Sequence, residues 1–207
     1  MPKIECIKPA YQSPICLSYK QNIKIDQCIE ICGKNNGAKY NCETHNFEVC
    51  DKIILKINSK RYYLDEYHFH IPAEHVINGC REESEVHYVF IELEADERYS
   101  KRETRHKHGR DVCGCPSSHS FDSNIMVIGR TIKCNNEYVD LSKLQVDVPC
   151  AYYEYDGTLT TPTYSPVRWI IGDDPICLNV KEICPIAKSA RPIQDTDGRI
   201  ILFGDDR

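Results

Sequence analysis

Apolar and polar residues alternate over several short stretches of this chain, and turn-forming residues bound each stretch. Because successive side chains of a strand point to opposite faces, a period of two predicts half-buried β-strands. Val, Ile, Tyr and Phe, which favour strands, are enriched in these stretches. The stretches with this pattern are residues 51–64, 66–71, 85–94, 124–134 and 168–172.

Turn signals separate the expected strands, and the chain offers little helical pattern. The turn signals are Asn36-Gly37, Asn78-Gly79, Asp156-Gly157 and Asp197-Gly198. The spacing of Cys28 and Cys32 indicates one face of a short helix. We therefore predict one strand-dominated domain over residues 1–207, which is a sandwich, a barrel or a large twisted sheet.

Residues 96–123 break the strand pattern, since they are polar, rich in Arg, Lys and His, and without an apolar period. We expect an exposed insertion loop here. Its side chains His106, His108, Cys113 and Cys115 are four soft ligands within ten residues. This leaves two alternatives open, a second metal site or a surface loop with a local disulfide.

Composition and charge exclude several classes of protein. The chain has 207 residues, of which 41% are hydrophobic and 28% charged, as in an ordinary soluble globular protein. The formal net charge of −5 argues against a nucleic-acid-binding protein. We expect no transmembrane segment because the apolar runs are short, and no signal peptide because the start lacks an apolar core. These features favour a cytoplasmic or virion-associated location.

The chain contains thirteen cysteines. Their odd number leaves at least one thiol free or paired with another chain, so a homo-oligomer is one expected arrangement. Free thiols are the default without a signal peptide. A count this high instead favours an oxidising final environment with disulfides, or metal binding.

Three histidines are candidates for a metal site. His68 and His70 share one face of an expected strand, while Tyr67 and Phe69 point to the other face. His87 lies in a second strand-like run. If the two strands are neighbours, three imidazoles converge, which suits Zn²⁺ with a fourth position left for water. Zinc lowers the pKa of that water to about 7.

Two carboxylates accompany these histidines. Glu85 lies two residues before His87, and Glu66 lies two residues before His68. Each could accept a hydrogen bond from the second ring nitrogen of its histidine. The alternative interpretation of His68 and His70 is a chance pair of half-buried residues on a strand.

The stretch from Tyr67 to His87 resembles the active-site signature of the α-class carbonic anhydrases, and its short His70–His87 spacing resembles the bacterial-type members. Further motifs resemble the family in the family's order and cover nearly the whole chain. These motifs are Gln12-Ser13-Pro14-Ile15, Asn35-Asn36-Gly37, Met126-Val127-Ile128-Gly129, Tyr155 to Pro162, Val167-Arg168-Trp169 and Arg191-Pro192-Ile193-Gln194.

The resemblance implies a fold and an activity. The fold is mainly β, with a large twisted, mostly antiparallel central sheet and few short helices. The activity is the zinc-dependent, reversible hydration of CO₂ to bicarbonate and a proton by zinc-bound hydroxide. The implied zinc ligands are His68, His70 and His87, with Glu85 as the carboxylate partner of His87.

The resemblance also implies the groups that act on the substrate. Thr160 would accept a hydrogen bond from the zinc-bound hydroxide and pass its own proton to Glu74, which positions the hydroxide. Thr161 would lie beside bicarbonate. An apolar wall that could equally be plain core packing would hold CO₂, and it consists of Val89, Val127, Leu159, Val167 and Trp169.

The chain departs from the family at several positions. Ala38 follows Asn-Asn-Gly where efficient members have a proton-shuttling histidine, so we expect slow turnover at low buffer concentration. Glu66 stands in place of the family's Gln near the first ligand and should make the zinc-bound water less acidic. The family's disulfide is not clearly reproduced, because Tyr164 stands where the second cysteine is expected.

A second hypothesis rests on the short N-terminal segment and on the abundance of Lys, Ile, Asn, Asp and Tyr. These features resemble the carbonic-anhydrase-like envelope proteins of poxviruses, which bind glycosaminoglycan. The basic segment 101–110 could bind a sulfated polymer, although it could equally be a solvated loop. The alternative function is therefore a virion or cell-surface adhesion protein with little or no activity.

Overall fold

A computed structural model describes residues 11–18, 22–25, 27–93 and 123–205, which fold mainly into β-strands. The strands up to residue 93 are β1 (Cys16–Leu17), β2 (Asn22–Ile25), β3 (Ile29–Cys32), β4 (Lys39–Asn41), β5 (Asn46–Glu48), β6 (Ile54–Ile57), β7 (Lys60–Ile71), β8 (Val76–Ile77) and β9 (Ser84–Glu92). The later strands are β10 (Ile125–Cys134), β11 (Ala151–Thr158), β12 (Pro166–Gly172), β13 (Ile176–Leu178), β14 (Lys188–Ser189) and β15 (Ile201–Asp205). The helical elements of the described chain are the 3₁₀ turn η2 (Leu141–Lys143) and the helix α1 (Val180–Ile183).

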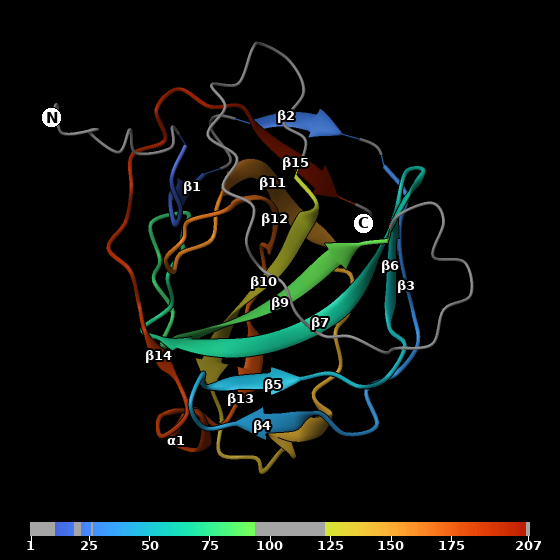
Figure 1. The fold of residues 1–207 in the computed structure, drawn as a ribbon. Coiled ribbons are helices and arrows are strands. Elements are labelled where there is room, and N and C mark those ends of the chain that lie inside the picture. Colours follow the sequence, from blue (N-terminus) through green and yellow to red (C-terminus); the bar gives the residue numbers. More distant parts are fainter. Residues whose placement is uncertain (1–10, 19–21, 26, 94–122, 206–207) are drawn as a thin grey trace, which may run out of the picture.

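Thirteen strands form one sheet, whose main path runs β2-β15-β11-β12-β10-β9-β7-β5-β4. Figure 1 shows β7, β9 and β10 as long, twisted neighbours across the middle of the molecule. Most pairings along this path are antiparallel, but β2 runs parallel to β15 and β12 runs parallel to β10. Off the path, β13 runs parallel to β10 and β14 runs parallel to β7. The predicted fold class, with its large central sheet and few short helices, is confirmed.

The central strands are buried on both faces, and each face has its own hydrophobic core. In β9, Val86, Tyr88 and Phe90 point into the larger core, and His87 and Val89 point to the other face. The smaller core on that face is called the site-side core. Its buried residues are Ile15, Leu17, Ile77, Val89, Val127, Ala151, Tyr153, Tyr155, Val167, Trp169, Ile171, Ile201 and Phe203.

Residues 51–64, which were expected to form one strand, instead contain β6, a tight turn and the first part of β7. β6 ends at Ile57, Asn58 adopts a φ of 53°, and β7 begins at Lys60. A left-handed φ at Asn suits a tight turn, because its short polar side chain tolerates this conformation. β7 then continues through residues 66–71, so the first two expected strands overlap one long strand of the sheet.

Two local predictions are wrong. Asp156-Gly157 is not a turn, because both residues lie inside β11, and a Cβ at Gly157 would overlap the Ser13 hydroxyl. The glycine serves close packing there. The stretch that contains Cys28 and Cys32 is not helical, since Ile29–Cys32 forms strand β3 and pairs with β6. Its β-branched isoleucines favour the extended chain.

The turns predicted at Asn78-Gly79 and Asp197-Gly198 are present, with positive φ at each residue. Residues 96–122 of the predicted loop lie outside the described residues, and so do the basic segment and the His106, His108, Cys113 and Cys115 group. The structure therefore does not address either alternative for that group.

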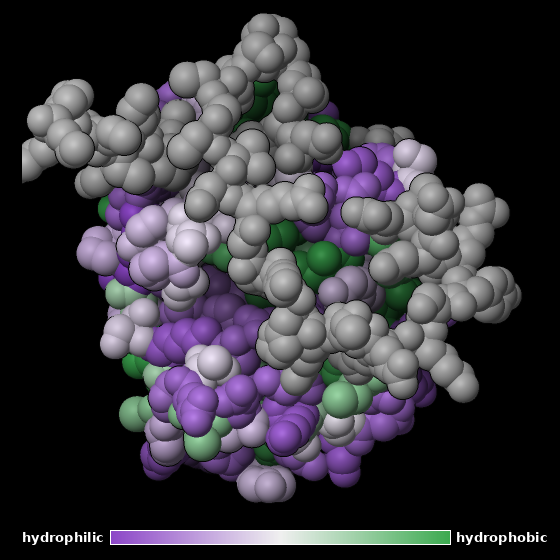
Figure 2. Space-filling view, in the orientation of Figure 1, coloured by the Kyte–Doolittle hydropathy of each residue, from purple (hydrophilic) through white to green (hydrophobic). Residues whose placement is uncertain are grey.

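Disulfides are not found among the ten cysteines that the structure describes, and nine of these are exposed. The described cysteines thus give no support to the prediction of an oxidising environment. No described helix is long and apolar enough to span a membrane. On the face drawn in Figure 2, hydrophilic residues predominate around β4 and β5.

Candidate metal centre

His68, His70 and His87 converge on one side of the sheet. β7 and β9 are antiparallel neighbours, and their register places His68 directly opposite His87. Because residues two apart in a strand share a face, His70 projects on the same side. One ring nitrogen from each histidine lies within 4.8 Å of the other two. The three residues are 7%, 1% and 1% exposed, so the cluster is nearly dry.

The neighbours of each ring decide which nitrogen keeps a lone pair. Nε2 of His87 lies 3.0 Å from Oε1 of Glu85, and an ionised carboxylate can only accept, so Nε2 donates and Nδ1 keeps the lone pair. Nδ1 of His70 lies 3.4 Å from the carbonyl oxygen of Ser189, which likewise leaves Nε2 as the acceptor. Within the described part of the chain, this buried Nε2 has no hydrogen-bond partner.

Burial favours neutral imidazoles at two of the three positions. Desolvation lowers the pKa of His68 and of His70 well below the ordinary value for histidine, and the neighbouring imidazoles act in the same direction. Neutral, buried nitrogens with unused lone pairs are the donors that a divalent zinc ion prefers. The residues present therefore fit a zinc ion, and His68, His70 and His87 would hold it.

Glu85 is the centre of a buried network that the sequence analysis described only in part. Its Oε1 lies 2.7 Å from Nδ1 of His75, and its Oε2 accepts hydrogen bonds of 2.8 Å from the backbone N–H groups of Glu74 and His75. Burial opposes the charge of Glu85, but the imidazoles of His75 and His87 outweigh it and hold the pKa of Glu85 well below its usual range. The carboxylate therefore stays ionised and fixes the orientation of both rings.

His75 was missed as a functional residue, although it lies next to Glu74 within the matching stretch. It is completely buried, and its Nε2 lies 2.6 Å from the Tyr155 hydroxyl, which lies 3.1 Å from Oγ of Ser13. The sequence places these groups far apart, so only the pairing of distant strands shows that they form one chain of hydrogen bonds.

Glu74 and Thr160 are both buried beside this network, but the predicted hydrogen bond between them is not formed. Oε1 of Glu74 accepts a 2.7 Å hydrogen bond from the backbone N–H of Arg191. Oε2 lies 4.0 Å from Nδ1 of His87 and has no hydrogen-bond partner among the described residues. A buried carboxylate oxygen without a partner is costly, which indicates that a donor joins it in the working site. The relay through Thr160 stays a prediction, as does the role of half-buried Thr161.

Glu66 lies beside the first histidine, as expected. Its Oε1 is 3.5 Å from Nδ1 of His68, and its Oε2 accepts a short hydrogen bond from the side-chain amide of Asn46. Nδ1 of His68 has no hydrogen-bond partner among the described residues, so the carboxylate acts on this ring through its charge alone.

The five residues predicted to form an apolar wall do belong to one cluster. Val89, Val127, Val167 and Trp169 are buried in the site-side core, and Leu159 packs against it. The Trp169 ring meets the His87 ring edge-on, with centroids 4.8 Å apart. The histidine cluster therefore adjoins an apolar surface.

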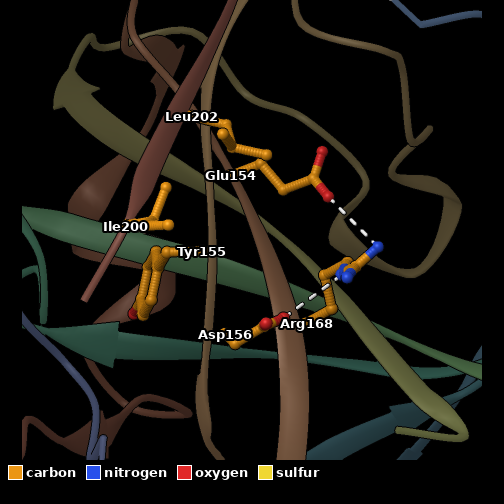
Figure 3. Close-up of a pocket in the computed structure, with 6 residues that line it drawn as sticks. All are labelled: Glu154, Tyr155, Asp156, Arg168, Ile200 and Leu202. Carbon is orange, nitrogen blue, oxygen red and sulfur yellow. Dashed lines mark hydrogen bonds and ion pairs between the residues drawn. The ribbon is translucent and has the colours of Figure 1, made fainter. Parts of the chain in front are cut away.

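A cavity of about 260 Å³ lies away from this cluster. Figure 3 shows Arg168 between Glu154 and Asp156, with Leu202 on β15 and Ile200 just before that strand. Since Arg168 precedes Trp169 in β12, its side chain points to the opposite face of the sheet from the histidines. This cavity is not part of the candidate metal centre.

The profile of the eukaryotic-type carbonic anhydrase family matches residues 3–203, and the chain belongs to this family. A carbonic anhydrase from Pectobacterium carotovorum is 25% identical over 156 residues, which cover 72% of this chain and 61% of that protein. Dioscorin DB3L from Dioscorea polystachya is 29% identical and covers 71% of this chain and 56% of its own length.

Solved structures agree with the fold. The α-carbonic anhydrase from Thermovibrio ammonificans, in complex with sulfanilamide, has a TM-score of 0.66 and 22% sequence identity, and covers 93% of this chain and 86% of that one. The predicted bacterial-type spacing and viral origin have no support from these similarities. The chain spans only 61% of the first relative and 56% of the dioscorin, so its activity is a matter for proposal.

Proposed function

We propose that this chain is a zinc-dependent carbonic anhydrase that interconverts CO₂ and bicarbonate. The observation that carries the proposal is the meeting of three buried imidazoles with an apolar wall on one face of the sheet. A zinc ion held by His68, His70 and His87 would supply an acidic water and hence a nucleophile near neutral pH. CO₂ is apolar and forms few hydrogen bonds, so an adjoining apolar wall suits it.

The chain's own residues would bind, orient and exclude water. Glu85 holds the His87 ring with Nδ1 free, and the side chains of Val127 and Trp169 keep the neighbouring space dry. Thr160 would donate a proton to the unpartnered Oε2 of Glu74 and keep its own oxygen available as an acceptor. A relay of this kind would speed the reaction by holding the reacting groups in the correct orientation.

Metal analysis and CO₂ hydration test the proposal together. Purified protein is expected to contain one zinc per chain and to hydrate CO₂, and His87→Ala is expected to lose both properties. His45→Ala is the matched control, because His45 pairs with Tyr40 and lies outside the cluster. Wild-type protein without zinc, or undiminished activity of His87→Ala, would overturn the proposal.

The alternative function, adhesion to a sulfated polymer, rests on the basic segment 101–110 and is proposed from sequence alone. Retention on heparin that disappears when the segment's charges are neutralised would favour it. The variant for this test carries glutamine at Lys101, Arg102, Arg105, Lys107 and Arg110. If the salt concentration had no effect on the elution of the wild-type protein from heparin, this would count against adhesion.

A further inference from the structure

Strand β3 (Ile29–Cys32) lies at an edge of the sheet and carries a thiol at each end. Among the strands of the described chain it pairs with β6 alone, and Figure 1 shows these two strands side by side. Cys28 directly precedes β3, and Cys32 is its last residue. An edge strand presents a row of backbone N–H and C=O groups with which a further strand can pair.

The hydrogen bonds of β6 show which backbone groups of β3 face this edge. The N–H of Leu64 on β7 donates to the carbonyl oxygen of Ile53, which directly precedes β6. In an antiparallel strand the N–H and C=O of one residue point to the same neighbour, and those of the next residue point to the other. Residues 55 and 57 of β6 therefore face β7, and residues 54 and 56 face β3.

The register between β6 and β3 extends this alternation to the edge strand. Cys32 and Glu30 lie opposite residues 54 and 56, so their backbone groups point inward to β6. The backbone groups of Ile29 and Ile31 consequently face the open edge. A strand added at this edge would form hydrogen bonds to the two isoleucines, and Glu30 and Cys32 would occupy non-hydrogen-bonded positions opposite it.

The polar residues of this strand lie on an accessible face. Alternation places Cys28, Glu30 and Cys32 on one side of the strand, while the isoleucines between them pack against the larger core. Cys28 is exposed and Cys32 is half-buried. Glu30 forms an exposed ion pair of 2.9 Å with Lys56, and Sγ of Cys32 lies 3.1 Å from Oε1 of Glu30. Both thiols are therefore within reach of a partner strand.

We propose that β3 pairs antiparallel with β3 of a second copy of this chain, about a two-fold axis at Glu30, and that two Cys28–Cys32 disulfides join the copies. This axis sets Cys28 of each copy opposite Cys32 of the other. Paired Cα atoms at non-hydrogen-bonded positions are about 4.5 Å apart, within the range of about 4.4–6.8 Å that disulfides require. Within one copy the two cysteines are separated by about 13 Å of extended chain, so they cannot bridge each other.

The rest of the strand suits the same register. Ile29 lies opposite Ile31 of the other copy, so the outward backbone groups of the two edges meet. The two Glu30 carboxylates approach each other at the axis, and the Lys56 ammonium of each copy offsets their repulsion. Neither cysteine belongs to the histidine cluster, so the inference is independent of the proposed function.

Each bridge forms by thiol–disulfide exchange with a small disulfide, here oxidised glutathione. One cysteine thiolate attacks it, releases one glutathione thiol and remains in a mixed disulfide, from which the thiolate of the other copy displaces the second glutathione. One S–S bond replaces two S–H bonds, and the two protons and two electrons leave in the two glutathione thiols. Excess reduced glutathione reverses the reaction, so the covalent dimer responds to the redox state.

Peptide mapping of the full-length chain tests the pairing. Unlabelled and ¹⁵N-labelled protein are reduced, mixed and oxidised with glutathione disulfide, and the remaining thiols are alkylated before trypsin digestion. Trypsin cuts after Lys24 and Lys34, so one peptide carries both cysteines. We expect two copies of this peptide joined by two disulfides, with a mixed-isotope form among them. A peptide bridged only within itself, or linked only to other cysteines, would overturn the inference.

Complementation between single variants tests the register. In Cys28→Ser and in Cys32→Ser the remaining thiol faces a serine of the other copy, so neither variant alone should yield linked peptides from β3. An equimolar mixture of the two should yield one bridge, between Cys28 and Cys32. Parallel or random pairing would instead link each variant to itself, and this result, or a mixture without the bridge, would overturn the inference.

Cys42→Ser is the matched control, because Cys42 is an exposed cysteine outside β3. It should give the doubly bridged peptide in the same yield as the wild type. Circular dichroism of each variant monitors folding, and alanine replaces serine if a serine variant does not fold. Loss of the bridged peptide in Cys42→Ser would show that the link depends on thiols outside β3, contrary to the inference.

Discussion

Oε1 of Glu85 lies 3.0 Å from Nε2 of His87, two residues further along β9. Such a contact requires that both side chains leave the strand on the same face, which the period of two guarantees. The same oxygen also lies 2.7 Å from Nδ1 of His75. One carboxylate therefore fixes the tautomer of a metal-ligand candidate and connects it to the interior of the protein.

Replacement of Glu85 by glutamine should weaken both metal binding and the fold. Glu85→Gln keeps the size of the side chain but presents an amide N–H to groups that are themselves donors. We expect zinc affinity to fall about 10–100-fold, as is typical when the carboxylate behind a metal-bound histidine is lost. Chelator competition measures this change, and Glu30→Gln, at the exposed glutamate of β3, is the control.

Removal of the His75 ring nitrogens should destabilise the protein even without metal. His75→Phe preserves an aromatic ring of similar size but removes two buried hydrogen bonds, which leaves the Tyr155 hydroxyl with Ser13 and Oε1 of Glu85 with His87 as remaining partners. We expect the free energy of unfolding in urea to fall by about 3 kcal/mol. A loss below about 1 kcal/mol would mean that water replaces the imidazole, contrary to the dry network proposed here.

A methyl group at Gly157 should disturb the contact between β11 and the N-terminal segment. In Gly157→Ala the Cβ would overlap the Ser13 hydroxyl and lie 2.9 Å and 3.1 Å from the rings of Tyr155 and Trp169. We expect a loss of about 2–3 kcal/mol in the free energy of unfolding. The double variant Ser13→Ala with Gly157→Ala should recover part of this loss, because only the clash with the hydroxyl is relieved.

Glu154 should make stability fall as the pH rises. Burial raises the pKa of Glu154, and Gln27 and Arg168 offset this only in part. The folded state therefore binds the proton more tightly than the unfolded chain does, and ionisation above the ordinary glutamate pKa of about 4.3 costs folding free energy. Urea unfolding at several pH values should show the free energy of unfolding of Glu154→Gln rising relative to that of the wild type from about pH 4 to pH 7. A difference in unfolding free energy that stays constant with pH would contradict this prediction.

Proton release should limit turnover when buffer is scarce. Ala38 has no titratable side chain, and it is buried in the larger core, with its N–H donating to the carbonyl of Ser142. We expect the CO₂ hydration rate at low buffer concentration to rise severalfold on addition of imidazole, whose pKa near 6.5 suits proton transfer. Fast turnover that is insensitive to buffer would show that another group of the chain transfers the proton.

The strand content and the shared face of His68 and His70 could be predicted because both follow from a local rule, the alternation of side chains along a strand. The split of residues 51–64 into a hairpin was missed because Asn58-Ser59 is a weak turn signal. The turn predicted at Asp156-Gly157 was wrong because this glycine is required by packing against another segment, where Ser13 leaves no room for a side chain.

The sequence by itself determined which residue types were available and how they alternate. This alternation made the three histidines and Glu85 candidates, while the apolar wall was implied only by the resemblance to the carbonic anhydrases. Tertiary structure alone decided that β7 and β9 are neighbours, that His75 and Tyr155 complete the Glu85 network, and that Lys188 stands beside His70. The physical reason is that alternation acts between adjacent residues. Strand pairing instead depends on burial and hydrogen bonding between segments far apart in the sequence, as in the pairing of Ile201 with Asn22.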